Sequence, residues 1–408
     1  MATQVHSRRY QRTFYDRPSV PGARPDSYNA RMANGPDILV IGGGIIGLTC
    51  AIRLREAGAT VAVYDRGDLG REASWAGAGI IPPGNPDRAA TPLDKLRAIG
   101  SATLPDVSAE LANATGIDNG YRINGGLEFL TPADEYAVEL WRAEGVAFER
   151  WDGPRLRDEE PGLSPPHSTC YHLSGMGQVR NPWHLRALIA HARDLGIALS
   201  PHTGVEGWCV ENGRVRGVQL ASGNRVTADR FLLAAGPWSE RHLNDLNCRP
   251  TVRPIRGQIL LLKTEAALLR RTLIDDKRYL VPRGDGRILV GSTEEPEAGF
   301  EKRTTEVGLA NLHAFARTIV PALANAKVEA SWAGLRPGSP DGMPFIGRVP
   351  GHDNVLAATG HSRAGIQLSL GTAQLVTELI FDRPTCVPKD AFALARRPDL
   401  QAKPAFRS

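Results

Sequence analysis

The first strong hydrophobic pattern in the chain predicts a buried strand, a glycine-rich turn and a helix. Residues 38–41 form an apolar run with β-branched side chains, and Gly-x-Gly-x-x-Gly follows at residues 42–47. Apolar positions then recur at helical spacing until Gly58, and residues 61–65 alternate as a half-buried strand does. This order of elements predicts a dinucleotide-binding βαβ unit.

Each glycine of this fingerprint has its own predicted role. Gly42 permits the tight turn, Gly44 lets the backbone approach a pyrophosphate, and Gly47 lets the helix lie close to the strand. The N-terminus of the helix, which includes Ile45 and Ile46, then faces the phosphates. We expect these residues to bind the cofactor.

Asp65 ends the second predicted strand and is the acidic residue expected to hold the ribose hydroxyls, with Arg66 beside it. A glycine-rich turn that binds nothing is the alternative, but the surrounding strands and helix favour a dinucleotide site. Of the other Gly-x-Gly pairs, those at 175–177 and 284–286 lack the third glycine, and the one at 77–79 is followed by Pro82 and Pro83, which forbid a helix there. The sequence therefore predicts a single dinucleotide.

Elsewhere, the pattern predicts that the chain leaves the first sheet and returns to it. Residues 230–236 are a buried strand that ends on small residues, and we expect it to rejoin that sheet. Helices are expected over 91–115, 132–144, 181–196 with Asn181 as its cap, 305–320 and 366–381. Further strands are expected over 123–131, 257–262, 279–282, 287–291, 328–332 and 354–359.

Length and composition fit a globular protein of two domains. The chain has 408 residues, of which 42% are hydrophobic. It has no apolar run long enough to span a membrane and no apolar segment behind the N-terminal arginines that would make a secretory signal. The five cysteines are dispersed and contain no Cys-x-x-Cys pair. We therefore expect neither a disulfide framework nor a zinc site, and a cytoplasmic location.

The net charge of +5 is concentrated at the two ends of the chain. Residues 1–35 carry six arginines against two aspartates, and residues 386–408 carry five basic against two acidic groups, so the body between them has a net charge of −2. No basic patch on the body or known module indicates a nucleic-acid partner. We predict a disordered tail over 1–35, with a transit-like or anion-binding segment as the alternative.

Ordered motifs along the chain resemble the D-amino acid oxidase superfamily of flavoproteins, and within it most closely the glycine oxidases of the thiamine pathway. The resemblance covers about residues 37–384. Its motifs are the N-terminal fingerprint and residues 71–79, 234–238, 256–258, 279–283, 332–338, 340–347 and 360–366.

The resemblance implies an α/β fold in which a Rossmann-type FAD-binding domain is interleaved with a smaller antiparallel-sheet α+β substrate domain. The FAD-binding domain is expected over 36–115, 168–248 and 336–385, and the substrate domain over 116–167 and 249–335. Residues 386–408 are expected to be a C-terminal tail.

The resemblance also implies that the dinucleotide is FAD. The turn before the last helix is expected to approach the flavin ring, although a simple strand-to-helix turn would have the same composition. There is no cysteine between Cys248 and Cys386 to tether a flavin, so FAD is expected to be non-covalent. Further cofactor-binding residues implied are Ser74, Ala78, Gly79, Val205, Ala235, Gly236, Gly360, Arg363, Ala364, Gly365 and Ile366.

Three side chains are the predicted substrate-binding and catalytic groups. Arginine matches a planar carboxylate in a way that lysine does not, and Arg336 is the first choice for that role. By resemblance, Tyr279 adds a hydroxyl hydrogen bond and Arg363 a second positive charge near the flavin. The structural alternatives are a surface ion pair for Arg336, a core position for Tyr279 and a helix-start arginine for Arg363.

The chemistry implied is FAD-dependent oxidation of glycine or another small amino acid or amine by hydride transfer. The products are an imine or 2-oxo acid, ammonia and, with molecular oxygen, hydrogen peroxide; the imine can serve thiazole formation for thiamine. A D-amino acid dehydrogenase that passes electrons to a quinone or carrier is the alternative. A third hypothesis is a flavin-binding subunit without chemistry of its own.

Other candidate groups are assigned no chemistry. His361 lies in the turn 360–365 and is interpreted as a structural hydrogen-bonding group rather than a general base. His191 and the other histidines lack metal-ligand spacing, so no metal is predicted. Leu289 replaces the lysine expected in a sarcosine-oxidase-type oxygen site, and Glu294 falls where glycine oxidases present a pocket side chain. The sequence is compatible with a homo-oligomer.

Overall fold

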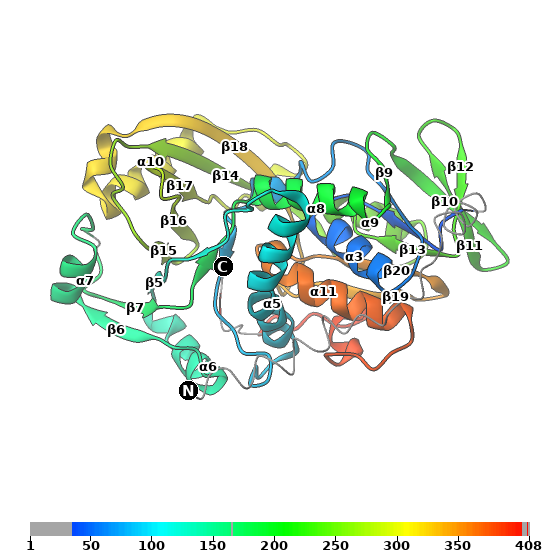
Figure 1. Ribbon diagram of the computed structural model, residues 1–408, viewed down its shortest axis with the longest axis horizontal. Helices are drawn as coiled ribbons and strands as arrows, with labels where there is room; N and C mark the ends of the chain where they lie inside the picture. Colours follow the sequence, from blue (N-terminus) through cyan, green and yellow to red (C-terminus); the bar gives the residue numbers. More distant parts are fainter. Residues whose placement is uncertain (1–34, 165, 402–405, 407–408) are drawn as a thin grey trace.

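The computed structural model describes residues 35–164, 166–401 and 406. The tail predicted over 1–35 lies, except for its last residue, outside the described residues. Two large sheets dominate the molecule and lie at opposite ends of its long axis (Figure 1). A cavity lies where they meet, and the two sheets supply opposite parts of its lining.

The six-stranded sheet has the Rossmann-type character that the fingerprint predicts. Its order is β19-β20-β13-β1-β2-β9, and all neighbours are parallel except β19, which is antiparallel to β20. The strands are β1 (Ile38–Ile41), β2 (Val61–Tyr64), β9 (Ala198–Ser200), β13 (Arg230–Leu233), β19 (Phe345–Val349) and β20 (His352–Thr359). The sheet therefore combines three distant parts of the chain, as expected.

Both faces of this sheet are covered, because side chains on a strand alternate between its faces. Ile38 and Val40 pack into a core with helices α3 (Ile45–Glu56), α5 (Pro92–Thr115), α8 (Asn181–Asp194) and α11 (Gly365–Ile380). Leu39 and Ile41 point into a second core with the small sheet β10 (Val205–Glu211), β11 (Arg214–Leu220) and β12 (Arg225–Thr227) and helix α9 (Ser239–Asn244).

The eight-stranded sheet has the order β18-β14-β17-β16-β15-β5-β7-β6 and is antiparallel except between β15 and β5. Helix α10 (Glu306–Ile319) covers one face through a core that contains Leu312 and Phe315. The strands are β5 (Gly126–Phe129), β6 (Glu149–Asp152), β7 (Thr169–Leu173), β14 (Arg253–Lys263), β15 (Thr272–Asp275), β16 (Arg278–Pro282), β17 (Arg287–Gly291) and β18 (Lys327–Gly338). This mixed α/β architecture confirms the predicted fold class.

Short elements complete the chain. A three-stranded sheet, β3 (Ile80–Ile81), β8 (Gly177–Gln178) and β4 (Arg122–Ile123), lies beside the cavity residues. The remaining helices are α4 (Ala73–Ala76), α6 (Tyr136–Glu144) and α7 (Gly153–Glu159), and the 3₁₀ turns are η1 (Pro132–Asp134), η2 (Gly236–Trp238), η3 (Pro296–Ala298), η4 (Pro321–Asn325) and η5 (Lys389–Phe392).

Several predicted boundaries need correction. The single strand predicted over 123–131 is two strands, β4 and β5, because the chain turns at Gly125, where φ is +77°. Asn181 does not cap α8; it is the first residue of the helix, and its Nδ2 donates to the Ser74 carbonyl oxygen at 2.8 Å. Strands β14 and β18 are longer than their apolar segments because they pair with each other along their length.

One domain boundary predicted from the sequence separates β7 from the strands it pairs with, and another divides β18. Strand β7 follows the predicted boundary at residue 168, yet it pairs with β5 and β6. Strand β18 runs through the boundary at residue 336 while it pairs with β14. We therefore propose that the substrate domain includes all of β7 and β18, since a strand belongs to the sheet that satisfies its backbone hydrogen bonds.

The segment 386–408, predicted as a C-terminal tail, packs against the body in much of its described part. Val387 and Phe392 join the core under α11, and Leu394 joins the core on the other face of the six-stranded sheet. The ring of Phe406 stacks on Trp141 with a centroid distance of 5.4 Å. Because the segment is rich in basic residues, its sequence did not indicate that these apolar side chains pack against the body.

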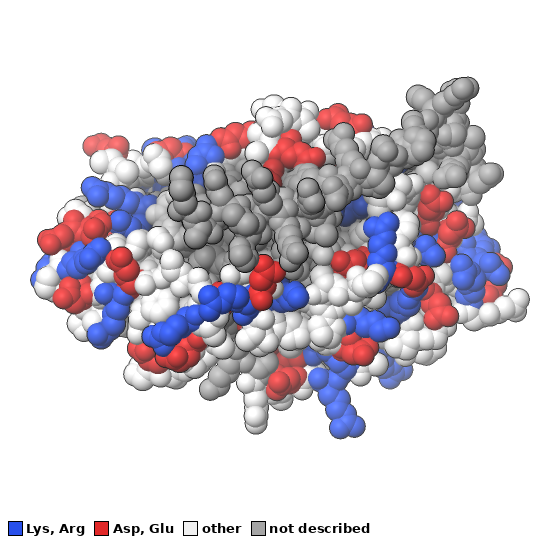
Figure 2. Space-filling view, turned by 60° about the horizontal axis from the view of Figure 1, so that its bottom comes forward, with Lys and Arg blue, Asp and Glu red and all other residues white. Residues whose placement is uncertain are grey.

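Three features of the described residues bear on what the sequence predicts about membranes, partners and disulfides. No helix within the described ranges is long and apolar enough to cross a membrane. Acidic and basic side chains are intermixed on the face shown in Figure 2. All five cysteines lie in the described part, and all are free thiols.

Candidate active site

The cavity is built at the carboxyl ends of the parallel strands. Its lining includes Gly42 after β1, Asp65 after β2 and Ala234 after β13. The opposite part of the lining comes from β14, β16 and β18 of the eight-stranded sheet. Ligands of open α/β sheets bind at this edge, so the location itself indicates a binding site.

The fingerprint adopts the geometry that its glycines predict. Gly42 has φ +108°, and a β-carbon there would lie 2.4 Å from the Ala234 carbonyl oxygen. A β-carbon at Gly47 would lie 1.9 Å from the Gly42 carbonyl oxygen, so this glycine permits close contact between helix and turn. Gly44 is the N-cap of α3 and offers no side-chain cap. Because Gly44 has no side chain, the N-cap residue does not obstruct the approach of a pyrophosphate to the helix N-terminus.

Two polar side chains fix this turn. The Ile45 N–H donates to Ser74 Oγ at 2.9 Å, and the Gly43 N–H donates to Asp65 Oδ2 at 2.7 Å. The other oxygen of Asp65 accepts from the Gly67 N–H at 2.8 Å. Burial raises the pKa of the Asp65 carboxyl, while these two backbone hydrogen bonds oppose the rise. Each carboxylate oxygen keeps a further lone pair for a hydroxyl donor.

The cavity residues fit FAD. A glycine turn at a helix N-terminus suits its pyrophosphate, and an acidic residue at the end of β2 suits its ribose. The guanidinium of Arg66 lies 3.5 Å from the ring centroid of Trp238, and both residues line the same cavity. The cofactor residues predicted from the sequence that line it are Gly42, Gly44, Ile45, Ile46, Asp65, Arg66, Ser74, Ala78, Gly79, Val205, Ala235, Gly236, Arg363, Ala364, Gly365 and Ile366. Gly47 and Gly360 do not line it.

The three predicted substrate-binding residues lie at this cavity too. Tyr279 on β16 and Arg336 on β18 line it, and Arg336 Nη1 donates to the Thr293 carbonyl oxygen at 3.3 Å. Arg336 Nη2 also donates to Ser292 Oγ at 2.6 Å. Burial lowers the pKa of Arg336, and the nearby positive charge of Arg363 lowers it further. A partly buried guanidinium in this setting is suited to bind a carboxylate.

Arg363 is held at the start of α11 by residues from the other sheet. Its Nη2 donates to the Lys277 carbonyl oxygen at 2.6 Å, and its Nη1 lies 3.3 Å from Glu294 Oε2. Lys277 Nζ lies 3.1 Å from Glu294 Oε1. Arg363 therefore connects the two sheets beside the cavity.

His361 lines the cavity but is not poised as a base. Its Nε2 lies 3.0 Å from Thr372 Oγ1, and burial lowers its pKa to about 3. It is neutral at physiological pH. The predicted structural role fits this geometry better than proton transfer does.

Comparison with known proteins identifies the family. Residues 37–379 match the family model described as FAD dependent oxidoreductase. The chain belongs to this family. The match confirms the predicted superfamily and the predicted cofactor, FAD.

Individual relatives of this flavoenzyme agree with that assignment. It is 38% identical over 345 residues to a glycine oxidase of Pseudomonas putida, an alignment that covers 84% of this chain and 94% of that protein. The crystal structure of glycine oxidase from Geobacillus kaustophilus superposes with a TM-score of 0.83 at 29% identity, over 89% of this chain and 99% of the other. A structure of iminodiacetate oxidase from Chelativorans sp. gives a TM-score of 0.77 at 25% identity, over 87% and 98%.

Sequence reasoning missed residues that shape the substrate end of the flavoenzyme cavity. Ser292 follows β17 and carries no motif signal of its own, yet it contacts Arg336. A β-carbon at Gly291 would lie 2.5 Å from the Tyr279 ring, so this glycine leaves space for the tyrosine. Strand pairing could have indicated this, because Gly291 and Tyr279 are register partners.

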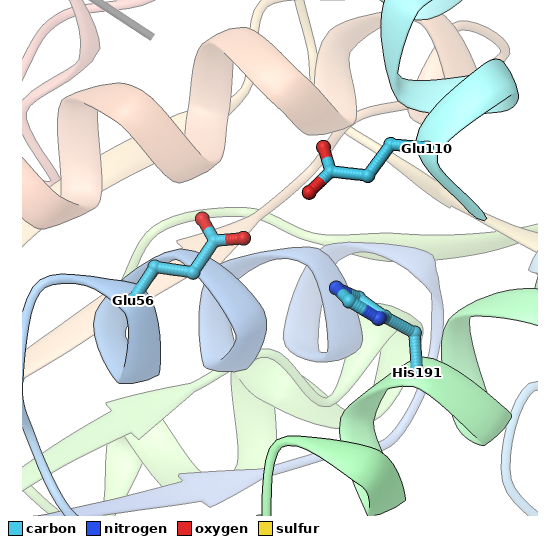
Figure 3. Close-up of side chains that lie close together, drawn as sticks. All are labelled: Glu56, Glu110 and His191. Atoms are coloured by element: carbon cyan, nitrogen blue, oxygen red, sulfur yellow. The ribbon is translucent and has the colours of Figure 1, made fainter. Parts of the chain in front are cut away.

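The structure also gathers three side chains that linear spacing keeps apart. Among the described residues, Glu56, Glu110 and His191 place ligand-type atoms within 4.8 Å of one another, and Figure 3 shows them facing a common point. They come from α3, α5 and α8 and do not line the cavity. Glu56 already accepts from Arg53 Nη1 at 2.7 Å. We interpret the group as a polar cluster between packed helices and assign no metal to it.

Proposed function

We propose that this flavoenzyme oxidises glycine or another small amino acid or amine by removing a hydride from the α-carbon. The observation that carries the proposal is that Arg336 and Tyr279 line the same cavity as the dinucleotide fingerprint. A carboxylate-binding pair at the flavin end of such a cavity suits an amino acid substrate. The glycine oxidases among its relatives support the same reading.

The side chains of the chain bind and orient the substrate in this proposal. The Arg336 guanidinium holds the carboxylate by two parallel hydrogen bonds, and the Tyr279 hydroxyl donates a third. Ser292 keeps the guanidinium in place, since its Oγ accepts from Nη2 at 2.6 Å. A carboxylate held in this way limits the positions that the α-carbon can take.

FAD held in this cavity would supply the hydride acceptor, and molecular oxygen would then take up the electrons to give hydrogen peroxide. The substrate reacts as the neutral amine, whose lone pair becomes part of the imine bond. We assign no protein base, because His361 is neutral and faces Thr372. The imine hydrolyses to the 2-oxo acid and ammonia or serves thiazole formation for thiamine.

Three further points belong to the proposal. FAD is bound non-covalently, as no cysteine lies between Cys248 and Cys386. The enzyme works in the cytoplasm, a reducing compartment that free thiols fit. Molecular oxygen is the electron acceptor rather than a quinone or carrier.

The test is anaerobic mixing of the purified FAD-loaded protein with glycine, sarcosine, D-alanine or D-proline, followed by air. We expect loss of the oxidised flavin absorbance with at least one of them, and its return in air with release of hydrogen peroxide. Bleaching without peroxide on aeration would favour the dehydrogenase. If none of the four bleaches the flavin, the amine-oxidising function is wrong.

A further inference from the structure

A row of alternating charges leads from the surface to the carboxylate-binding arginine. Lys277 is 56% exposed, Glu294 34% and Arg363 20%, so the side chains become more buried toward the cavity. Glu294 lies between the two cations, 3.1 Å from Lys277 Nζ and 3.3 Å from Arg363 Nη1. The Glu294 carboxylate therefore binds the two cations at a position where an anionic ligand would otherwise bind them.

The charge of Glu294 is maintained by its surroundings. Burial by itself would raise the pKa of the Glu294 carboxyl, but Lys277, Arg363 and Arg336 outweigh it, so its pKa lies below the ordinary value. Glu294 therefore stays ionised at neutral pH. It neutralises one of three positive charges at the substrate end.

There is space on the outer side of this ion pair. Ser292 borders both the cavity that contains Arg336 and a second cavity. The charged residues that line the second cavity are Lys277, Glu294, Asp275, Asp276, Arg278 and Glu295. A substrate held by Arg336 could extend a second arm in this direction. The limit on that arm is then set by charge as well as by volume.

We propose that Glu294 is a specificity-determining residue that restricts the flavoenzyme to amines with a single carboxylate. This inference rests on the proposed function. With the first carboxylate on Arg336, a second one near Arg363 meets the negative charge of Glu294, and like charges placed together disfavour binding. Without that charge, Arg363 and Lys277 become a ready site for the second carboxylate.

The structure indicates which substrate class would report this effect. Iminodiacetate is an amine with two carboxylates, and a protein of the same fold is named as its oxidase. Glycine carries one carboxylate and has no second one to place near Glu294. The ratio of kcat/KM for the two compounds therefore isolates the charge at residue 294 from general damage to the site.

The experiment compares the FAD-loaded wild type with Glu294→Gln, Glu294→Asp and the control Glu297→Gln. Glu297 lies three residues away on η3 and is exposed, so its variant removes the same charge from the same loop. We expect Glu294→Gln to raise the iminodiacetate-to-glycine ratio of kcat/KM about tenfold. Glu294→Asp keeps the charge, and it and Glu297→Gln should leave the ratio near that of the wild type.

An equilibrium measurement accompanies the kinetics. Isothermal titration with glycolate and diglycolate, which replace the amine by oxygen and carry one and two carboxylates, reports binding without turnover. Glu294→Gln should tighten diglycolate about tenfold relative to glycolate. The inference is overturned if Glu294→Gln shifts neither ratio more than Glu297→Gln does, or if it changes both ligands of each pair equally. A wild type that oxidises no amine would overturn the proposed function instead, and the titration would still decide the role of Glu294.

Discussion

A β-carbon at Gly257 would lie 2.1 Å from Nη2 of Arg336, so the glycine on β14 leaves the space that the guanidinium on β18 occupies. The two strands are antiparallel partners, and Gly257 pairs with Gly334, two residues before the arginine. The proposed carboxylate-binding position thus depends on the missing side chain at Gly257 as much as on the arginine itself.

Gly257→Ala should therefore displace the Arg336 guanidinium. We expect the KM for glycine to rise at least about tenfold, because a bidentate contact depends on alignment, while the flavin spectrum remains normal. Steady-state oxidation measured by peroxide release checks this. Gly207→Ala is the matched control, since a β-carbon on that strand glycine would meet nothing within 4 Å. Equal KM values for the two variants would remove the steric argument.

Asp65→Asn should weaken FAD binding. The carboxylate accepts from the Gly43 and Gly67 N–H groups and is the predicted ribose ligand, and an amide can accept only through its oxygen. We expect the dissociation constant of FAD to rise at least about tenfold, since hydrogen bonds to charged groups contribute about 1.5–3 kcal/mol. Fluorescence titration of the apoprotein measures it. Asp68→Asn, which changes an exposed partner of His202, should bind FAD like the wild type.

Asp341→Asn should lower the free energy of unfolding, and the decrease should be larger at neutral than at acidic pH. Asp341 and Arg396 form a buried pair, with 0% and 8% of their side chains exposed. Removing one partner of such a pair costs about 3–5 kcal/mol. Burial raises the pKa of the Asp341 carboxyl, but Arg396 and two backbone N–H groups hold it below the ordinary value.

The lowered pKa of Asp341 determines how the stability of the protein changes with pH. The ion pair makes its full contribution to the free energy of unfolding above the pKa of the unfolded state, about 3.9. That contribution is lost as the pH falls through the lower pKa of the folded state. Thermal unfolding should therefore show a large difference between wild type and variant at pH 7 and a smaller one near pH 3. A difference that does not change with pH would contradict this account.

His361→Gln should reduce the sensitivity of stability to acid. Burial lowers the pKa of His361 to about 3, whereas unfolded histidine binds a proton below about 6.5. Acid thus favours the unfolded state, by about 2 kcal/mol between pH 6.5 and 5 for one such group. Denaturant unfolding at these two pH values should show a smaller decrease in the variant. His202→Gln changes a side chain that is 68% exposed and should behave like the wild type.

The fingerprint region shows what a sequence can predict. The tight turn at Gly42 and the position of Asp65 after β2 depend on nearby residues, and both are found where the pattern places them. The ribose-binding role of Asp65 stays a prediction. The predicted helix over 91–115 is likewise found as α5 at 92–115, because a capping Thr91 and Gly116 mark its ends locally.

The substrate end was less accessible to sequence reasoning because it depends on pairing between distant strands. Ser292 reaches Arg336, 44 positions away, only because β17 and β18 both pair with β14. The ion pairs of Glu294 with Lys277 and Arg363 join three segments in the same way. The resemblance to known motifs identified Arg336 and Arg363 as candidates. The residues that orient them could be recognised only from the folded structure.

Anaerobic stopped-flow reduction of the flavin by glycine, in wild type and Arg336→Lys, tests the central claim most directly. We predict saturable reduction in the wild type and at least a tenfold higher apparent Kd in the variant, about 1.4 kcal/mol or more, because lysine cannot bind a carboxylate with two parallel donors. The oxidised flavin spectrum should be the same in both. An unchanged Kd, or a wild-type flavin that glycine and the other amines leave oxidised, would contradict the account.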